Sequence, residues 1–169
     1  MITQLNNQLV ALVFKEGTMG KISIYTDGAC SVNPGPGGWG FNIYDVKGNC
    51  IFSDSGNEKY STNQRMELIA CIAGINKVII THSPPFHIDL YTDSAYICNC
   101  IQDQWYIKWE GNGWYNAKGE PVKNRDLWEA LLTLMRFPSV DIKFIKVKAH
   151  SGDPKNEAVD KLAKAAIRR

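Results

Sequence analysis

The organisation of the chain follows from residues 25–40, which read Tyr25-Thr26-Asp27-Gly28-Ala29-Cys30-Ser31-Val32-Asn33-Pro34-Gly35-Pro36-Gly37-Gly38-Trp39-Gly40. Apolar residues alternate at Ile22 and Ile24 and lead into Asp27, and a turn rich in glycine and proline follows at once. The alternation predicts a strand, and the turn predicts a hairpin into the apolar run that begins at Trp39. The sequence therefore predicts that the Asp27 carboxylate lies in a strand beside a tight turn.

Three more acids lie in comparable settings downstream of Asp27. Glu67 opens a helical pattern, Asp93 ends an apolar run, and Asp160 lies in the C-terminal helical pattern. Few cysteines or histidines are near these acids in the sequence, and hard divalent cations prefer oxygen ligands. Together the four acids indicate a site for hard divalent cations.

The composition is typical of one folded domain, since 44% of the 169 residues are hydrophobic and 21% are charged. The net charge is only +2, so any nucleic-acid-binding surface would have to be a local basic patch. Five cysteines without a C-x-x-C pair predict reduced, packed thiols and a cytoplasmic location. The apolar run Leu9–Phe14 is too short to span a membrane, so neither a signal peptide nor a membrane anchor is expected.

The remaining patterns predict a mixed α/β fold. Strands are expected at about 21–28, 38–46, 49–56, 87–92 and 141–148, and helices at about 63–80, 94–101, 124–137 and 154–168. Because helices connect the last two strands, parallel pairing is expected beside the antiparallel hairpin. Residues 1–20 carry no recognisable chemistry, and an edge strand, a short helix or a loosely attached arm would each fit them.

Several motifs occur together in one order: Thr26-Asp27-Gly28, Asn33–Gly38, Arg65-Met66-Glu67, Tyr91-Thr92-Asp93-Ser94, Trp105–Asn124, and His150-Ser151-Gly152 with Asp160 beyond it. Together they resemble ribonuclease H type 1 of the bacterial type, over about residues 21–168. The resemblance implies a ribonuclease H-like fold with a five-stranded mixed sheet flanked by helices. It also implies an extension at 1–20 and a catalytic domain at 21–169 that carries a handle-like insert at about 103–123.

The resemblance implies an endonuclease that hydrolyses the RNA strand of RNA–DNA hybrids and leaves 3′-hydroxyl and 5′-phosphate ends. Its catalytic acids would be Asp27, Glu67, Asp93 and Asp160, which would hold two Mg²⁺ ions, or Mn²⁺, with substrate. Two cations about 4 Å apart suit an in-line displacement at a phosphodiester. His150 would move a proton or aid product release, since imidazole titrates near neutral pH.

The resemblance also implies how the chain reads its partner, the hybrid duplex, through the 2′-hydroxyl that separates RNA from DNA. The matching positions are Asn33, Asn63, Gln64 and the backbone near Cys30, Glu67 and Ser94, with Thr62 and Asn33 for a DNA phosphate and Trp105 for a DNA sugar. A monomer that does not bind membranes is the family expectation.

Some positions depart from the family pattern. Gln64 stands where a second asparagine is common, Ala95 where glutamine is common, and Tyr60 where arginine is common. The basic residues of the insert and its flank are offset by acids: Lys108, Lys118, Lys123 and Arg125 against Asp103, Glu110, Glu120 and Asp126. We therefore expect weaker and less salt-sensitive hybrid binding than in a relative with a basic insert.

Three other classes of protein were weighed. A junction resolvase, integrase or transposase can share clustered acids, but the motifs around Glu67 and Asp93 disfavour them. A non-catalytic module that binds hybrids or double-stranded RNA would be expected to lack one or more of the acids. A retroviral polymerase fragment is disfavoured by the insert. We interpret the remaining aromatic and histidine residues as structural: His82, His87, Trp109 and Trp114.

Overall fold

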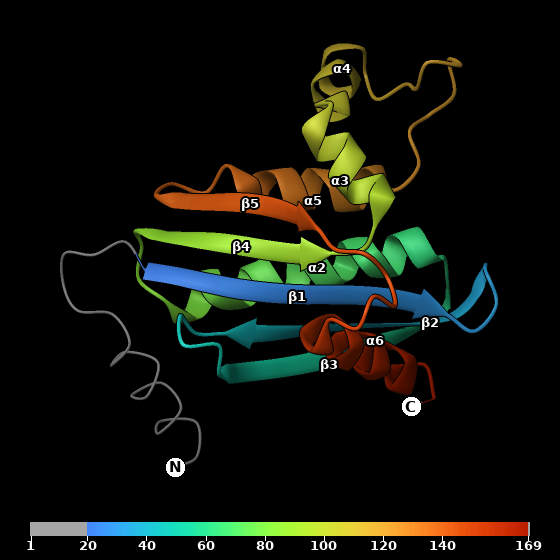
Figure 1. Ribbon diagram of the computed structural model, residues 1–169. Helices are drawn as coiled ribbons and strands as arrows, with labels where there is room; N and C mark the ends of the chain where they lie inside the picture. Colours follow the sequence, from blue (N-terminus) through green and yellow to red (C-terminus); the bar gives the residue numbers. More distant parts are fainter. Residues whose placement is uncertain (1–19, 169) are drawn as a thin grey trace.

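The computed structural model describes residues 20–168, which form one five-stranded sheet with helices on both faces (Figure 1). The strands are β1 (Gly20–Cys30), β2 (Gly35–Tyr44), β3 (Cys50–Ser61), β4 (Phe86–Thr92) and β5 (Val140–Lys146). The helices are α2 (Asn63–Thr81), α3 (Ala95–Gln102), α4 (Trp105–Gly111), α5 (Arg125–Met135) and α6 (Pro154–Ala166). Of the predicted extension at 1–20, all but Gly20 lies outside the described residues.

The sheet is mixed, as the sequence predicts. Its strand order is β3-β2-β1-β4-β5. The hairpin strands β1, β2 and β3 pair antiparallel, whereas β4 pairs parallel to both β1 and β5.

The hairpin strands are longer than the sequence predicts. β2 begins at Gly35 and β3 continues to Ser61, because these two residues still pair beyond a bulge in the ladder. The run of glycine and proline predicts only a turn, but the first residues of a strand tolerate glycine and proline where the ladder is irregular, as it is between Gly35 and Gly37.

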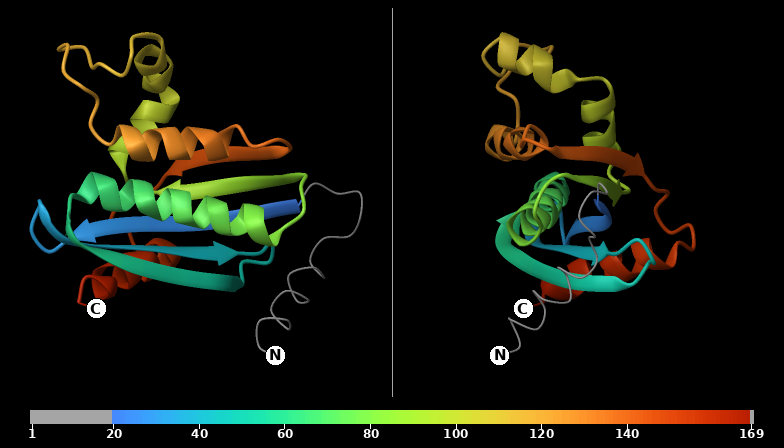
Figure 2. Two further views of the ribbon diagram at one scale, coloured as in Figure 1. Left: turned by 180° about the vertical axis from the view of Figure 1, so that it is seen from behind. Right: turned by 90° about the vertical axis from the view of Figure 1, so that its left-hand side faces the viewer.

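The helices form two layers around the sheet (Figure 2). α2 and α5 cover one face, where Ile24, Leu68 and Trp128 belong to the main hydrophobic core. α6 covers the other face and packs mainly on β1 and β2, where Tyr25 and Val159 belong to a smaller core. Since α6 lies over only part of its face, much of β4 and β5 has no covering helix on that side within residues 20–168 (Figure 1).

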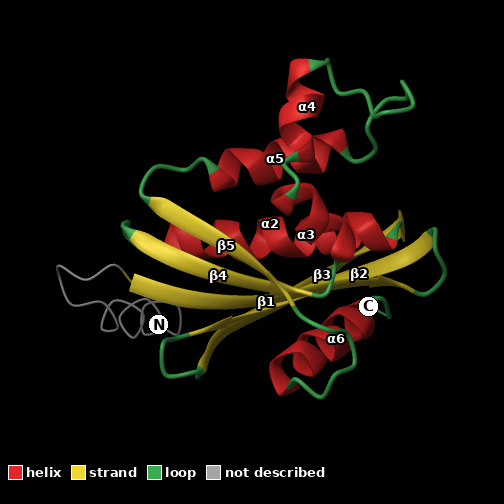
Figure 3. Ribbon diagram, turned by 45° about the horizontal axis from the view of Figure 1, so that its top comes forward, coloured by secondary structure: helices red, strands yellow, loops and turns green. Residues whose placement is uncertain are grey.

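Residues 103–123 project past β5 and α5 as helix α4 and a long loop (Figure 3). The Trp109 ring lies 5.7 Å from the Trp128 ring and 6.0 Å from the Trp114 ring, measured between centroids. Trp114 and Trp128 are both buried. Trp109 and Trp114 therefore pack the base of this segment against α5, as interpreted from the sequence.

All five cysteines carry free thiols. Burial raises the pKa of both Cys71 and Cys100 to about 12, which makes these thiols inert at neutral pH. Cys50 is exposed, so the prediction that every thiol is packed is wrong for this residue, which lies at the start of an edge strand. In the described part of the chain, no helix is long and apolar enough to cross a membrane.

Candidate active site

Parallel strand pairing brings two of the four predicted acids together. Asp27 is a buried residue of β1, and Asp93 directly follows β4. Tyr25 pairs with Tyr91 in the parallel ladder between these strands. Asp27 and Asp93 each lie two residues further along, so their side chains leave the same face of the sheet at neighbouring positions.

Two glycines let helices on opposite faces approach Asp27. A Cβ atom at Gly28 would lie 2.2 Å from the backbone of α2, beside Glu67. On the other face, a Cβ atom at Gly38 would lie 2.2 Å from the backbone of α6, one turn beyond Asp160. Any larger residue would push these helices away, so the glycines allow Glu67 and Asp160 to approach from two sides.

The surroundings of Asp27 strongly disfavour its ionised form. Burial, followed by the charge of Asp93, raises the pKa of Asp27 to about 8, and Asp160 adds to the rise. The Gly28 N–H opposes it by donating a 2.8 Å hydrogen bond to Asp27 Oδ1. Burial is the larger cause of this shift, and the contributions of Asp93 and Asp160 show that their carboxylates lie within electrostatic range of Asp27.

Glu67 is perturbed in the same direction. Burial raises its pKa to about 7, and the charge of Asp93 contributes to the rise. The Ser94 hydroxyl donates a 2.5 Å hydrogen bond to Glu67 Oε2, and this bond lowers the pKa of Glu67 and so opposes the rise. Ser94 also caps α3 by accepting the N–H of Ile97 at 3.3 Å, so the helix cap and the carboxylate share one hydroxyl. Asp93 is thus within electrostatic range of both Glu67 and Asp27.

The donor chemistry of the four acids fits a hard divalent cation, because every donor atom is a carboxylate oxygen and positive charge would relieve their repulsion. Three of the acids have partners inside the protein: the Gly28 N–H for Asp27, the Ser94 hydroxyl for Glu67, and Lys164, whose Nζ lies 2.8 Å from Asp160. Between residues 20 and 168, no three His, Cys, Asp or Glu side chains stand together as a ready-made metal site. The raised pKa values of Asp27 and Glu67 indicate that the acids are near one another. To bind one cation together, their carboxylate oxygens would have to turn toward a common point.

Five of the predicted substrate-binding residues gather where the β1–β2 hairpin meets α2. Asn63 Oδ1 accepts a 2.8 Å hydrogen bond from the Cys30 N–H, and Asn33 Oδ1 accepts one of 3.2 Å from the Asn63 N–H. Thr62 caps α2 through its hydroxyl. A hollow of about 530 Å³ beside them is lined by Asn33, Pro34, Thr62, Gln64, Lys123 and Asn124.

Trp105 and His150 have different surroundings. Trp105 lies on α4 and lines a separate hollow of about 440 Å³ with Lys108 and Tyr115. His150 is exposed on the loop from β5 to α6, with a left-handed φ of 51°. Among the described contacts, no hydrogen bond or ion pair ties either residue to the four acids.

Sequence reasoning missed three residues of these sites. Lys164 lies four residues after Asp160 on α6, and this spacing on a helix could have predicted their ion pair. The sequence places Lys123 and Asn124 in the insert and its flank, but the fold brings them into the hollow beside Thr62 and Gln64. No local pattern links two segments that are about sixty residues apart, so only the packing of α5 against α2 reveals this contact.

The sequence pattern of the RNase H family matches residues 19–168. A protein named ribonuclease H from Moorella thermoacetica is 45% identical over 149 residues, which cover 88% of this chain and 93% of the relative. Another protein of that name, from Syntrophomonas wolfei, is 47% identical over 150 residues, which cover 89% of this chain and 98% of the relative.

Solved structures show the same fold. LC9-RNase H1, a type 1 RNase H with the type 2 active-site motif, superposes with a TM-score of 0.74 at 24% identity, covering 91% of this chain and 75% of that one. LC11-RNase H1, solved in complex with an RNA/DNA hybrid, gives a TM-score of 0.66 at 24% identity, covering 87% and 96%. At this level of identity the likeness concerns the fold.

Proposed function

The chain belongs to the RNase H family, and on that premise we propose that it is an endonuclease that hydrolyses the RNA strand of RNA–DNA hybrids. The relatives named ribonuclease H, at 45% and 47% identity over most of both chains, support this function. The observation that carries it is the gathering of four carboxylates from separate segments: the charges of Asp93 and Asp160 act on buried Asp27, and the charge of Asp93 also acts on Glu67. A cluster of repelling acids is costly to fold, and its cost is explained if the cluster binds cations for catalysis.

The proposed cofactors are two Mg²⁺ ions, with Mn²⁺ as an alternative, held with substrate by Asp27, Glu67, Asp93 and Asp160. If held there, the ions would supply activation of a water molecule and stabilisation of the leaving oxygen in an in-line displacement. The carboxylates supply the negative charge that holds the cations, and the Ser94 hydroxyl orients Glu67. Cleavage of the bond on the 3′-oxygen side of a phosphate would leave a 3′-hydroxyl and a 5′-phosphate.

His150 is proposed to move a proton during product formation or release. Its exposure on the loop between β5 and α6 supports this role, because an exposed imidazole can exchange protons with solvent. The loop is anchored where Asp153 Oδ1 accepts the N–H groups of Lys155 and Asn156 at the start of α6.

Hybrid binding is proposed to use the hollow at the start of α2. Asn33, Thr62, Asn63 and Gln64 supply amide and hydroxyl groups that can bind phosphates and 2′-hydroxyls, together with the backbone near Cys30 and Ser94. Lys123 in the same hollow adds a positive charge for a phosphate. Trp105 supplies a half-buried ring on which a sugar can pack.

We also propose that residues 21–169 act as the catalytic domain with the handle-like insert at about 103–123, and that the protein works as a cytoplasmic monomer. Light scattering after size-exclusion chromatography measures the oligomeric state, and a dimeric mass would contradict the monomer.

The function is tested with an end-labelled RNA–DNA hybrid in Mg²⁺, compared with RNA–RNA and DNA–DNA duplexes. We expect cleavage of RNA in the hybrid only, and a loss of at least about a hundredfold in Asp93→Asn, because that change removes a cation ligand. Asp54→Asn is the matched control, since Asp54 is an exposed acid on β3 and lies outside the cluster.

Two results would redirect the proposal. Tight hybrid binding without cleavage in Mg²⁺ or Mn²⁺ would indicate a binding module, and cleavage of a DNA-only junction would indicate another nuclease of the same fold. Equal loss of activity in Asp93→Asn and Asp54→Asn would remove the four-acid site from the mechanism.

A further inference from the structure

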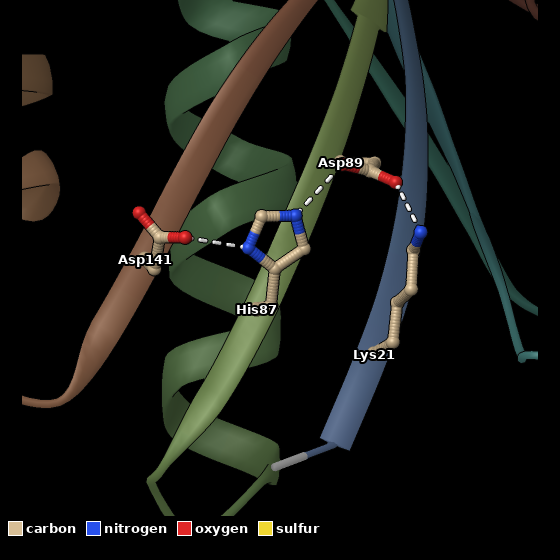
Figure 4. Close-up of polar contacts among 4 residues, drawn as sticks. All are labelled: Lys21, His87, Asp89 and Asp141. Carbon is tan, nitrogen blue, oxygen red and sulfur yellow. Dashed lines mark hydrogen bonds and ion pairs between the residues drawn. The ribbon is translucent and has the colours of Figure 1, made fainter.

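A second cluster of charged side chains, drawn in Figure 4, lies near the start of β1, whereas Asp27 lies near the end of that strand. It contains Lys21 of β1, His87 and Asp89 of β4, and Asp141 of β5. His87 is the register partner of both Lys21 and Asp141, so these three residues form a row across three strands. The row lies on the face that α6 covers only in part, so the cluster is separate from the candidate active site.

Both ring nitrogens of His87 contact a carboxylate. Nε2 lies 2.8 Å from Asp89 Oδ1, and Nδ1 lies 2.7 Å from Asp141 Oδ2. A neutral imidazole has only one N–H, so one of its nitrogens would place a lone pair against a carboxylate lone pair. The imidazolium ion donates from both nitrogens. The geometry therefore requires His87 to be protonated while both acids are ionised.

The two carboxylates differ in how much solvent they reach. The Asp89 side chain is only 8% exposed, whereas that of Asp141 is 69% exposed. Asp89 also binds Lys21, whose Nζ lies 2.9 Å from Oδ2. A buried carboxylate loses much when it loses a partner, but an exposed one can turn to water. We therefore expect neutral His87 to keep its one N–H on Nε2, where it donates to Asp89. The contact between Nδ1 and Asp141 is then the one that breaks.

We propose that His87 is a pH-operated latch, which joins the start of edge strand β5 to β4 when protonated and releases it when neutral. β5 is the last strand of the sheet and has only β4 as a strand neighbour. The Asp141–His87 pair is a cross-strand contact between directly opposed residues, the arrangement in which opposite charges stabilise a sheet.

The neighbouring charges favour the protonated form of His87. The hydrogen bond to Asp89 raises the pKa of His87 above its ordinary value of about 6.5, partial burial opposes this, and Asp141 adds to the rise. Burial alone would raise the pKa of Asp89, but hydrogen bonds from Lys21 and His87 hold it below its usual range.

Other ionisable groups lie on the same strands or against them. Lys143 is the register partner of Asp89 on β5, and Tyr91 on β4 lies within electrostatic range of Lys21. On the opposite face, the ring of His82 from α2 packs against Phe86. None of these groups stands between His87 and its two carboxylates in the described structure.

The direction of the pH dependence follows from the raised pKa of His87. A raised folded-state pKa gives stability that is fully present below the unfolded value and is lost as the pH rises through the folded value. The latch also needs ionised Asp89 and Asp141, so it is closed from mildly acidic pH and opens at a pH above about 6.5.

The test is a histidine-ring NMR titration of the intact protein, combined with amide exchange of β5. We expect His87 to titrate above 6.5, and its pKa to fall in Asp141→Asn. Amide protection in residues 140–144, corrected for the intrinsic exchange rate, should fall about two- to fivefold as His87 loses its proton. This step should be absent from Asp141→Asn and from His87→Gln.

Asp54→Asn is again the matched control, since it removes an exposed acid from β3, the edge strand at the other side of the sheet. It should leave both readouts unchanged. Three results would each overturn the latch. His87 could titrate at or below its ordinary pKa, its titration could be unaltered by Asp141→Asn, or the amide protection of β5 could stay constant while His87 titrates.

Discussion

At the scale of single residues, Asp27 combines burial with the negative charge of Asp93, and its pKa of about 8 stands well above the ordinary 3.8. A raised folded-state pKa gives stability below the unfolded value that is lost as the pH rises through the folded value. Metal-free protein should therefore lose stability between about pH 4 and pH 8 as the unfolded state alone gives up this proton.

Asp27→Asn removes the loss of stability that the metal-free protein undergoes when only its unfolded state ionises Asp27. We expect the variant to be more stable than the wild type by roughly 2 kcal/mol at pH 8, with a difference that shrinks toward pH 4, because the coupled acids share the full effect. Urea unfolding with a chelator present, at both pH values, measures the difference. A gain of the same size at both values would show that packing, and not charge, explains it.

Ser94 shows how one side chain can serve the fold and the site together. Its hydroxyl donates to Glu67 and accepts the N–H of Ile97 at the start of α3. The cap explains why α3 begins directly after Ser94, and the donated hydrogen bond lowers the pKa of Glu67 against the effect of burial. The position of Glu67 is thus coupled to the start of a helix from another part of the chain.

At the scale of elements, the site depends on how closely α2 and α6 approach the sheet. Gly28→Ala would place a methyl group against the backbone of α2 beside Glu67. We expect a loss of about 1–3 kcal/mol in stability, with a further loss of hybrid cleavage in the molecules that remain folded, because α2 must shift. Urea unfolding and cleavage rates per folded molecule measure the two effects.

Gly111→Ala is the control for this change, because a Cβ atom at Gly111 would meet nothing within 4 Å. We expect it to leave cleavage unchanged and stability within about 0.5 kcal/mol of the wild type. If Gly28→Ala behaved like Gly111→Ala, the close approach of α2 would have no part in building the site.

The same scale explains how the start of α2 meets α5. Both terminal nitrogens of the Arg65 guanidinium group donate to the carboxylate of Asp126, with Nη1 3.0 Å from Oδ1 and Nη2 2.9 Å from Oδ2. Two parallel bonds fix direction as well as distance. The pair holds the segment that carries Lys123 and Asn124 beside the hollow at the start of α2.

At the scale of the whole molecule, several acids near the insert bind basic residues of the body. Glu110 accepts hydrogen bonds of 2.8 Å from both Nη1 and Nη2 of Arg136, which directly follows α5, and Asp126 binds Arg65. Lys123 remains beside Gln64 in the proposed hybrid-binding hollow. The guanidinium groups of Arg65 and Arg136 are thus neutralised by acids, which supports the expected weak salt dependence of binding.

The salt dependence of hybrid affinity tests this arrangement. Lys123→Gln should reduce the slope of log affinity against log salt by about one, because one phosphate contact is lost. Lys118→Gln, at an exposed position in the loop of the insert, should leave the slope unchanged. Fluorescence anisotropy measures both slopes. A wild-type slope as steep as that of a relative with a basic insert would contradict the expectation.

The sequence alone determined the mixed sheet, the order of its strands along the chain and the four acids to examine. It also predicted every described helix except α4, which forms inside the insert. Alternation around Ile22 and Ile24, and the helical spacing after Glu67, depend on local preferences and on which faces are buried, so they can be read from neighbouring residues. The motif around Asp27 likewise carried its information locally, because a glycine must follow this acid for α2 to approach.

Only the tertiary structure decided which distant residues meet. It extended β3 to Ser61, brought Lys123 into the hollow at the start of α2, and set His87 between Asp89 and Asp141. His87 was interpreted from the sequence as merely structural. Strand alternation places Asp89 on the same face as His87, but nothing local marks Asp141 as its second partner. Strand register and helix packing are set by contacts between remote segments. A register shift of one residue in β4 would move the His87 side chain to the other face of the sheet.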